Sequence, residues 1–102
     1  MLSPMAVLSD SEIRQKLASL AGWTLGDGAI SRKLTFASFP DAIAFTTRLA
    51  FEAEASDHHP DILINYKRVT LTYSTHSEGG LTGKDFEGAA RADSVAAAMG
   101  GK

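Results

Sequence analysis

The sequence predicts an α+β fold: a single domain with the order α-β-β-α-β-β-α, whose four-stranded antiparallel sheet carries the helices on one face. Three capping signals mark three helices, and two pairs of alternating segments lie between them. A chain of 102 residues has room for one hydrophobic core. Two hairpins in so small a chain join most simply into one antiparallel sheet, which leaves the other sheet face to solvent or to binding.

Each predicted helix begins with Ser or Thr followed three residues later by an acid. In this pattern the two side chains cap each other's free backbone amides. The first helix has apolar residues at i, i+4 and i+7 and stops before Gly22, and the second has Pro40 in its first turn and runs to about Ser56. The third is rich in Ala and ends at Gly100. The capping pairs are Ser9 with Glu12, Ser38 with Asp41, and Thr82 with Asp85.

The strands are predicted from alternation of apolar and polar residues. Segments 23–25 and 30–36 flank an Asp-Gly turn and form the first hairpin. Segments 62–66 and 69–75 form the second hairpin, around Lys67 and Arg68. Trp23 is the only Trp of the chain and opens the first strand. A single Trp in a small domain is more often part of the core than a ligand platform, so we expect it to be buried.

Composition and charge exclude several functional classes. The 10 Lys and Arg residues against 12 Asp and Glu give a net charge of −2, so we expect no nucleic-acid partner held by phosphate neutralisation. The absence of Cys excludes disulfides, zinc-thiolate and iron–sulfur sites and thiol nucleophiles. No apolar stretch is long enough to span a membrane and the N-terminus lacks signal-peptide character, so we expect a cytoplasmic protein.

The N-terminal residues show no clear structural period. We therefore predict a loose tail over residues 1–8 and one folded domain over residues 9–102. Translation can begin at Met1 or at Met5, and the sequence does not distinguish them.

All three histidines of the chain fall within 19 residues. His58 and His59 occupy the connection after the second helix, where binding groups are often displayed. His76 follows the last strand and shares parity with that strand's polar residues. Imidazole exchanges a proton near neutrality, so the three side chains are candidates for general acid–base catalysis.

Two other interpretations of the histidines stay open at this point. At any single position, a histidine beside acidic residues is about as often a solvated surface residue as a functional one. Histidine with carboxylate also binds zinc or iron, but no established ligand spacing is present and we expect no metal. Among the neighbouring acids, Glu54 precedes His58 by four residues, and Asp85 is explained by its capping box alone.

A spaced motif joins these residues. The stretch from Glu54 to Pro60 reads EASDHHP and is followed after five residues by Tyr66, after nine more by His76 and after eight more by Asp85. This pattern resembles the signature of the pterin-4a-carbinolamine dehydratase family. The likeness extends over roughly residues 9–99 and includes the Gly-Trp pair of the first strand and the LTYSTH segment.

The resemblance implies a hydro-lyase that needs no cofactor, because the pterin is its substrate. Such an enzyme, a 4a-hydroxytetrahydrobiopterin dehydratase, removes water from the 4a-carbinolamine and yields quinonoid dihydropterin. The reaction regenerates tetrahydropterin after aromatic amino acid hydroxylation, which implies functional coupling to phenylalanine hydroxylase.

The family pattern also implies roles for individual residues. His58 and His76 act as the acid–base pair, and His59 helps to hold the pterin. The resemblance gives Glu54 the role of orienting His58. The neighbours implied to line the pocket, some through backbone groups, are Asp57, Ser74, Thr75 and Ser77. The residues with orienting or structural roles are Glu54, Pro60, Asp85 and Trp23.

The resemblance implies self-association as a homodimer or homotetramer. It also provides an alternative function, since animal members of the family serve as dimerisation cofactors for a homeodomain transcription factor. A non-catalytic binding or assembly module that retains the motif is therefore the competing hypothesis.

Overall fold

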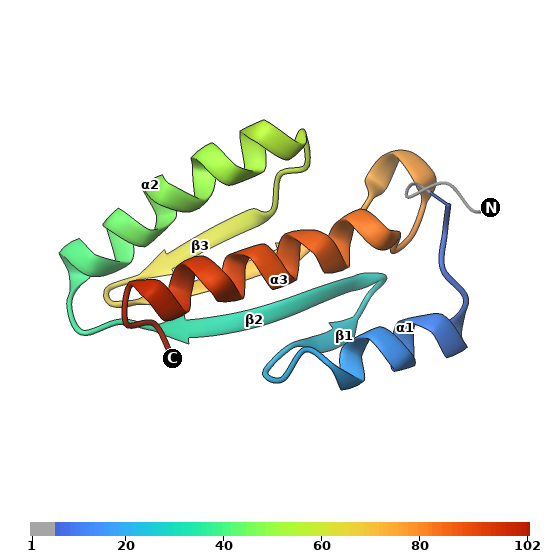
Figure 1. The fold of residues 1–102 in the computed structure, drawn as a ribbon, viewed down its shortest axis with the longest axis horizontal. Coiled ribbons are helices and arrows are strands. Elements are labelled where there is room, and N and C mark those ends of the chain that lie inside the picture. The colour runs from blue at the N-terminus through green and yellow to red at the C-terminus, as the bar shows by residue number, and fades with distance from the viewer. Residues whose placement is uncertain (1–5) are drawn as a thin grey trace.

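A computed structural model describes residues 6–102 of the chain (Figure 1). The predicted order α-β-β-α-β-β-α is confirmed, with one short 3-10 helix, η1, added before the last α-helix. The elements are α1 (Asp10–Ala18), β1 (Thr24–Gly26), β2 (Ala29–Thr35), α2 (Phe39–Ser56), β3 (Asp61–Asn65), β4 (Arg68–Tyr73), η1 (His76–Glu78) and α3 (Gly83–Ala98).

The four strands form one antiparallel sheet in the order β1-β2-β4-β3. The two hairpins join through β2 and β4, where Ile30 is paired with Tyr73 and Leu34 with Val69. Helices α2 and α3 lie side by side over one face of this sheet (Figure 1), and α1 contributes Ile13 to the core. The apolar face of β4 is therefore covered by the two long helices.

The core lies between the sheet and these helices. Val69, Leu71 and Tyr73 alternate along β4 and are fully buried, whereas Thr70 and Thr72 between them are only half-buried on the opposite face. This is the parity that the sequence predicts, because successive side chains of a strand point to opposite faces. Trp23 is also buried, as expected.

All three predicted N-caps are present. Ser9 and Glu12 cap each other's amides, Ser38 accepts from the amide of Asp41, and Thr82 pairs reciprocally with Asp85. The bond from the Ser9 amide holds the pKa of the Glu12 carboxyl below its ordinary value. These local interactions fix where each helix begins.

The end of α2 determines where the histidines begin. Asp57 adopts the left-handed conformation with φ of 52°, and the amide of His58 donates to the carbonyl of Ala53 at 3.1 Å. This C-terminal cap turns the chain away from the helix axis. His58 therefore leaves the helical register and faces α3.

The second hairpin differs from its prediction in two ways. Its turn lies at Tyr66 and Lys67, not around Lys67 and Arg68, because Tyr66 takes a positive φ of 56° and Arg68 pairs with Asn65. Two-residue hairpin turns need such left-handed positions. The last strand also ends at Tyr73, two residues earlier than predicted, since the chain turns into η1.

The predicted N-terminal tail lies partly outside the described residues, as do Met1 and Met5. Within the described part, the amide of Leu8 donates to the carbonyl of Leu81 at 2.9 Å, and Leu8 packs against the core. No helix within residues 6–102 has the length and apolar character needed to cross a membrane.

Candidate active site

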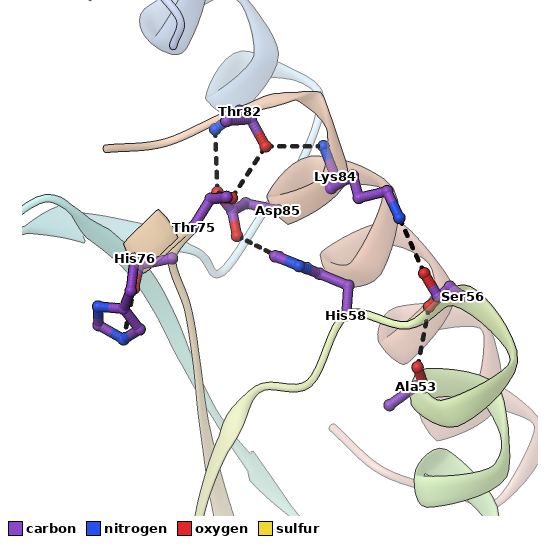
Figure 2. Close-up of polar contacts among 9 residues, drawn as sticks. Ala53, Ser56, His58, Thr75, His76, Thr82, Lys84 and Asp85 are labelled. Atoms are coloured by element: carbon purple, nitrogen blue, oxygen red, sulfur yellow. Dashed lines mark hydrogen bonds and ion pairs between the residues drawn. The ribbon is translucent and has the colours of Figure 1, made fainter. Parts of the chain in front are cut away.

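His58 is held at the junction of α2 and α3. Its Nε2 atom lies 2.6 Å from Oδ1 of Asp85 (Figure 2), and its side chain is 11% exposed. Asp85 is fully buried in the first turn of α3. A carboxylate accepts but does not donate, so Nε2 carries the hydrogen in this bond and Nδ1 is left as the second ring nitrogen.

The carboxylate of Asp85 is itself fixed by two further bonds to its second oxygen, whose donors lie on Thr75 and Thr82 (Figure 2). Oδ2 accepts from the backbone amide of Thr82 at 2.9 Å and from Oγ1 of Thr75 at 2.8 Å, while Oγ1 of Thr82 lies 2.9 Å from Oγ1 of Thr75. Asp85 thus caps α3 and orients His58 with the same carboxylate. The capping box, which alone explained Asp85 in the sequence, accounts for only one of the three hydrogen bonds of this carboxylate.

Tyr73 covers one face of the His58 ring. The two ring centroids are 6.0 Å apart and their planes differ by 17°. Burial, together with the negative charges of Asp85 and Asp93, raises the pKa of the Tyr73 phenol to about 12. The tyrosine therefore stays protonated throughout the pH range in which histidine titrates.

His59 faces solvent and pairs with Glu54. Its Nε2 atom lies 2.8 Å from Oε1 of Glu54, and both side chains are exposed. The expectation that Glu54 orients His58 is therefore wrong for this structure: the αL residue Asp57 ends the helix, so the i, i+4 geometry no longer connects Glu54 to His58. Asp85 occupies that orienting position instead.

His76 begins η1 and is exposed, with Nε2 lying 3.2 Å from Oγ of Ser74. Its ring lies on the far side of Thr75 from the ring of His58 (Figure 2). Asp57 and Ser77 are also exposed, whereas Thr75 is buried and its hydroxyl is committed to Asp85. The structure thus gathers the histidine motif at one end of the sheet without placing the three rings in one cavity.

A cavity of about 190 Å³ lies between α2 and α3, and His58 is the histidine that lines it. Leu49, Ala53 and Gly88 form an apolar part of its wall, and Tyr73 lines it beside His58. The remaining lining residues come from the two helices: Glu52, Ala55, Ser56, Lys84, Glu87 and Arg91. A small molecule that reaches His58 by this route meets the imidazole and the tyrosine together.

A second polar cluster, missed in the sequence, secures α3 against the sheet. Arg32 lies between Ile30 and Leu34 on the inward face of β2, and its Nη1 atom is 2.7 Å from Oδ1 of Asp93. The indole nitrogen of Trp23 lies 3.0 Å from both oxygens of the same carboxylate. The sequence contains a signal for this cluster, because Arg32 shares the inward-facing positions of Ile30 and Leu34. A charged side chain that faces a core requires a partner.

Within residues 6–102, no group of three His, Asp or Glu side chains is arranged to hold a metal ion.

Comparison with known proteins identifies the family. The family model described as pterin 4 alpha carbinolamine dehydratase matches residues 6–95. The chain belongs to this family. It is 51% identical over 90 residues to a Roseiflexus castenholzii protein named "Putative pterin-4-alpha-carbinolamine dehydratase", covering 88% of this chain and 97% of the relative. A Mycobacterium sp. (strain KMS) protein of the same name is 46% identical over 91 residues, covering 89% and 97%.

Solved structures extend the likeness to the pterin dehydratase fold. A transcriptional coactivator/pterin dehydratase from Brucella melitensis superposes with a TM-score of 0.85 at 38% identity, covering 88% of this chain and 98% of that chain. A pterin dehydratase-like protein identified as a RuBisCO assembly factor in the alpha-carboxysome superposes with a TM-score of 0.63 at 26% identity, covering 74% and 89%. Proteins of this fold therefore differ in function, and the assignment for this chain depends on its site.

Proposed function

We propose that this pterin dehydratase family member dehydrates 4a-hydroxytetrahydrobiopterin to quinonoid dihydropterin by histidine general acid–base catalysis. The observation that carries the proposal is the bond from His58 to a fully buried carboxylate that is itself fixed by Thr75 and Thr82. A proton-transferring imidazole needs a defined tautomer and orientation, and a carboxylate that is itself held in place supplies both.

The reaction requires only proton transfers from the protein. The bond from C4a to the hydroxyl oxygen breaks, that oxygen gains a proton and leaves as water, and a ring nitrogen loses a proton as the C=N bond forms. The reaction is not a redox process, so we propose that it uses neither a cofactor nor a metal. Two groups, one acid and one base, are sufficient.

We assign the base to His58. Asp85 accepts the hydrogen bond from the N–H at Nε2, so the lone pair at Nδ1 is available to the substrate. His76 is the proposed acid; its exposed ring can change rotamer as the substrate binds. His59 contributes to pterin binding from the rim. The other residues proposed to border the substrate are Asp57, Ser74, Thr75 and Ser77, with Thr75 contributing backbone groups because its hydroxyl is used by Asp85.

The test is a coupled assay in which phenylalanine hydroxylase generates the 4a-carbinolamine and its ultraviolet decay is followed. We expect wild type to accelerate the decay and His58→Ala, alone or with His76→Ala, to lose about 10²- to 10⁴-fold of that acceleration. Circular dichroism confirms that the variants are folded. Equal rates for wild type and the double variant would refute the histidine mechanism.

The competing function is a non-catalytic binding or assembly module; the carboxysome protein of this fold is described as a RuBisCO assembly factor. Complete lack of acceleration by folded wild type would favour this alternative. With activity present, the proposed setting is cytoplasmic regeneration of tetrahydropterin alongside phenylalanine hydroxylase.

We also propose that the chain forms a homodimer or homotetramer. Phe39 and Phe51 on α2, and Leu63 on β3, are large apolar side chains that are about half to three-quarters exposed. Packing of such side chains against a second copy of the chain would remove their apolar surface from water. Light scattering coupled to size exclusion is expected to give two or four times the mass of 10.8 kDa at micromolar concentration; a strict monomer would contradict the proposal.

A further inference from the structure

Thr75 is a polar residue in a position of the apolar core. It lies just beyond β4 and continues the alternation of the inward-facing residues Val69, Leu71 and Tyr73, and like them it is buried, at 3% exposed. Valine has the same β-branched shape, and a buried hydroxyl costs free energy unless it is hydrogen-bonded, so packing alone favours valine here. The hydrogen bonds of Thr75 show what its hydroxyl contributes.

These hydrogen bonds run in one direction (Figure 2). The hydroxyl of Thr75 donates to Oδ2 of Asp85 at 2.8 Å. A threonine has a single O–H hydrogen, so the 2.9 Å bond between the hydroxyls of Thr75 and Thr82 is donated by Thr82. Oγ1 of Thr82 in turn accepts from the backbone amide of Lys84 at 3.3 Å. The chain of donors therefore ends on the carboxylate, whose other oxygen accepts from Nε2 of His58 at 2.6 Å.

Thr75 is the donor that ties this carboxylate to the end of the sheet. The other donor to Oδ2 is the amide of Thr82, which belongs to the cap of the helix that carries Asp85. Thr75 lies ten residues before Asp85, where the chain leaves β4, so its hydroxyl joins the sheet to the first turn of α3. All three side chains are at most 3% exposed, and in such surroundings a hydrogen bond is stronger than in water. The direction in which the carboxylate faces therefore depends on this contact as well as on the helix cap.

We propose that Thr75 is a positioning residue of the active site, whose hydroxyl holds the Asp85 carboxylate in the orientation that keeps the hydrogen of His58 on Nε2. The inference rests on the proposed function, in which Nδ1 of His58 is the base. Without the Thr75 hydroxyl, Oδ2 keeps only the amide of Thr82, and the carboxylate is free to turn away from the imidazole. The imidazole then also populates the second tautomer, in which Nδ1 carries the hydrogen and has no lone pair for the substrate.

The experiment separates the hydroxyl of Thr75 from the packing of its side chain. Thr75→Val keeps the β-branched shape and removes the hydroxyl, whereas Thr75→Ser keeps the hydroxyl and removes the methyl group. Thr75→Ser and Thr75→Ala form a second pair that differs only in the hydroxyl, which serves if valine disrupts the fold. The matched control is Thr72→Val on β4, because the hydroxyl of Thr72 is bonded to that of Ser31 at 2.9 Å on the opposite face of the sheet.

Three measurements are made on each variant. Nitrogen chemical shifts of the neutral His58 ring report its tautomer, the dehydratase assay gives kcat and KM, and urea unfolding reports the stability. The tautomer is the measurement that a purely structural role of Thr75 would leave unchanged in a folded variant.

We expect Thr75→Val to lower kcat about 10- to 100-fold, as for one hydrogen bond to a charged group, with KM changed less than about 2-fold. Its ring nitrogen shifts should be those of a tautomer mixture, whereas wild type gives those of the Nε2–H form. Thr75→Ser should recover most of the lost kcat and the single tautomer, even if loss of the methyl group makes it the less stable variant. Thr72→Val should match wild type in kcat and in tautomer.

Wild-type kcat and an unchanged tautomer in Thr75→Val would overturn the inference and leave the proposed function standing. An equal loss of kcat in Thr75→Ser would also overturn it, because packing and not the hydroxyl would then be responsible. A fall in kcat without a change of tautomer would do the same, since the hydroxyl would not act through His58.

Failure of the proposed function gives a different result. Folded wild type without dehydratase activity would refute that function, and the tautomers of Thr75→Val and Thr75→Ser would still decide whether the Thr75 hydroxyl positions His58. A changed tautomer in Thr75→Val with wild-type kcat would support the positioning and refute His58 as the base.

Discussion

Replacing Asp85 with asparagine is expected to lower kcat about 10²- to 10⁴-fold while the protein remains folded. The asparagine oxygen can still accept from the amide of Thr82 and the hydroxyl of Thr75, which preserves the cap of α3. Its amide group then faces His58 as a donor. Nε2 must become the acceptor, the hydrogen moves to Nδ1, and the proposed base loses its lone pair.

The matched control is Asp93→Asn, on the same helix. Asp93 holds Trp23 and Arg32 and does not contact His58, so its amide variant should reduce stability without a comparable fall in kcat. Nitrogen chemical shifts of the His58 ring report the tautomer directly, and urea unfolding reports the fold. Near-wild-type kcat in Asp85→Asn with the same tautomer would show that Asp85 serves only as a helix cap.

Alanine at position 85 is a less informative variant. It leaves the amide of Thr82 and the hydroxyl of Thr75 without their acceptor and removes the reciprocal cap of α3. The expected loss is about 2 to 4 kcal/mol, a large fraction of the stability of a small domain. A loss of activity in that variant would not separate orientation of His58 from unfolding.

The elements of the fold were predictable because their signals are local. Each capping pair spans three residues, and the parity of Val69, Leu71 and Tyr73 is visible along one strand. The turn of the second hairpin was misplaced by one residue because its left-handed position is taken by Tyr66, and tyrosine carries no turn signal. Tertiary pairing of Arg68 with Asn65 determines the register there.

The site was less predictable because its decisive contacts are not local. Glu54 was expected to orient His58 from the preceding helical turn, but the cap at Asp57 reverses the geometry and Glu54 meets His59 instead. The partner of His58 is 27 residues away along the chain. Motif spacing brought His58 and Asp85 into one signature, and the packing of α3 against the end of α2 brings the two side chains into contact.

Gly88→Ala is expected to destabilise the protein by up to about 2 kcal/mol and to lower activity. Alanine within a helix normally gains up to about 1 kcal/mol over glycine. At this position, however, its Cβ would lie 2.5 Å from Cε1 and 3.0 Å from Cζ of Tyr73. Such overpacking costs about 1 to 3 kcal/mol, because the tyrosine ring is buried beside Trp23 and His58 and must shift.

A double-mutant cycle with Tyr73→Leu identifies the source of that cost. Leucine removes the ring that the new methyl group would strike, so in this background Gly88→Ala should become neutral or stabilising through its helix propensity. Urea unfolding of the four proteins gives the coupling energy, and the dehydratase assay shows whether kcat falls with the ring displacement in the single variant. If Gly88→Ala is equally destabilising in both backgrounds, the contact of α3 with Tyr73 is not the source of the cost.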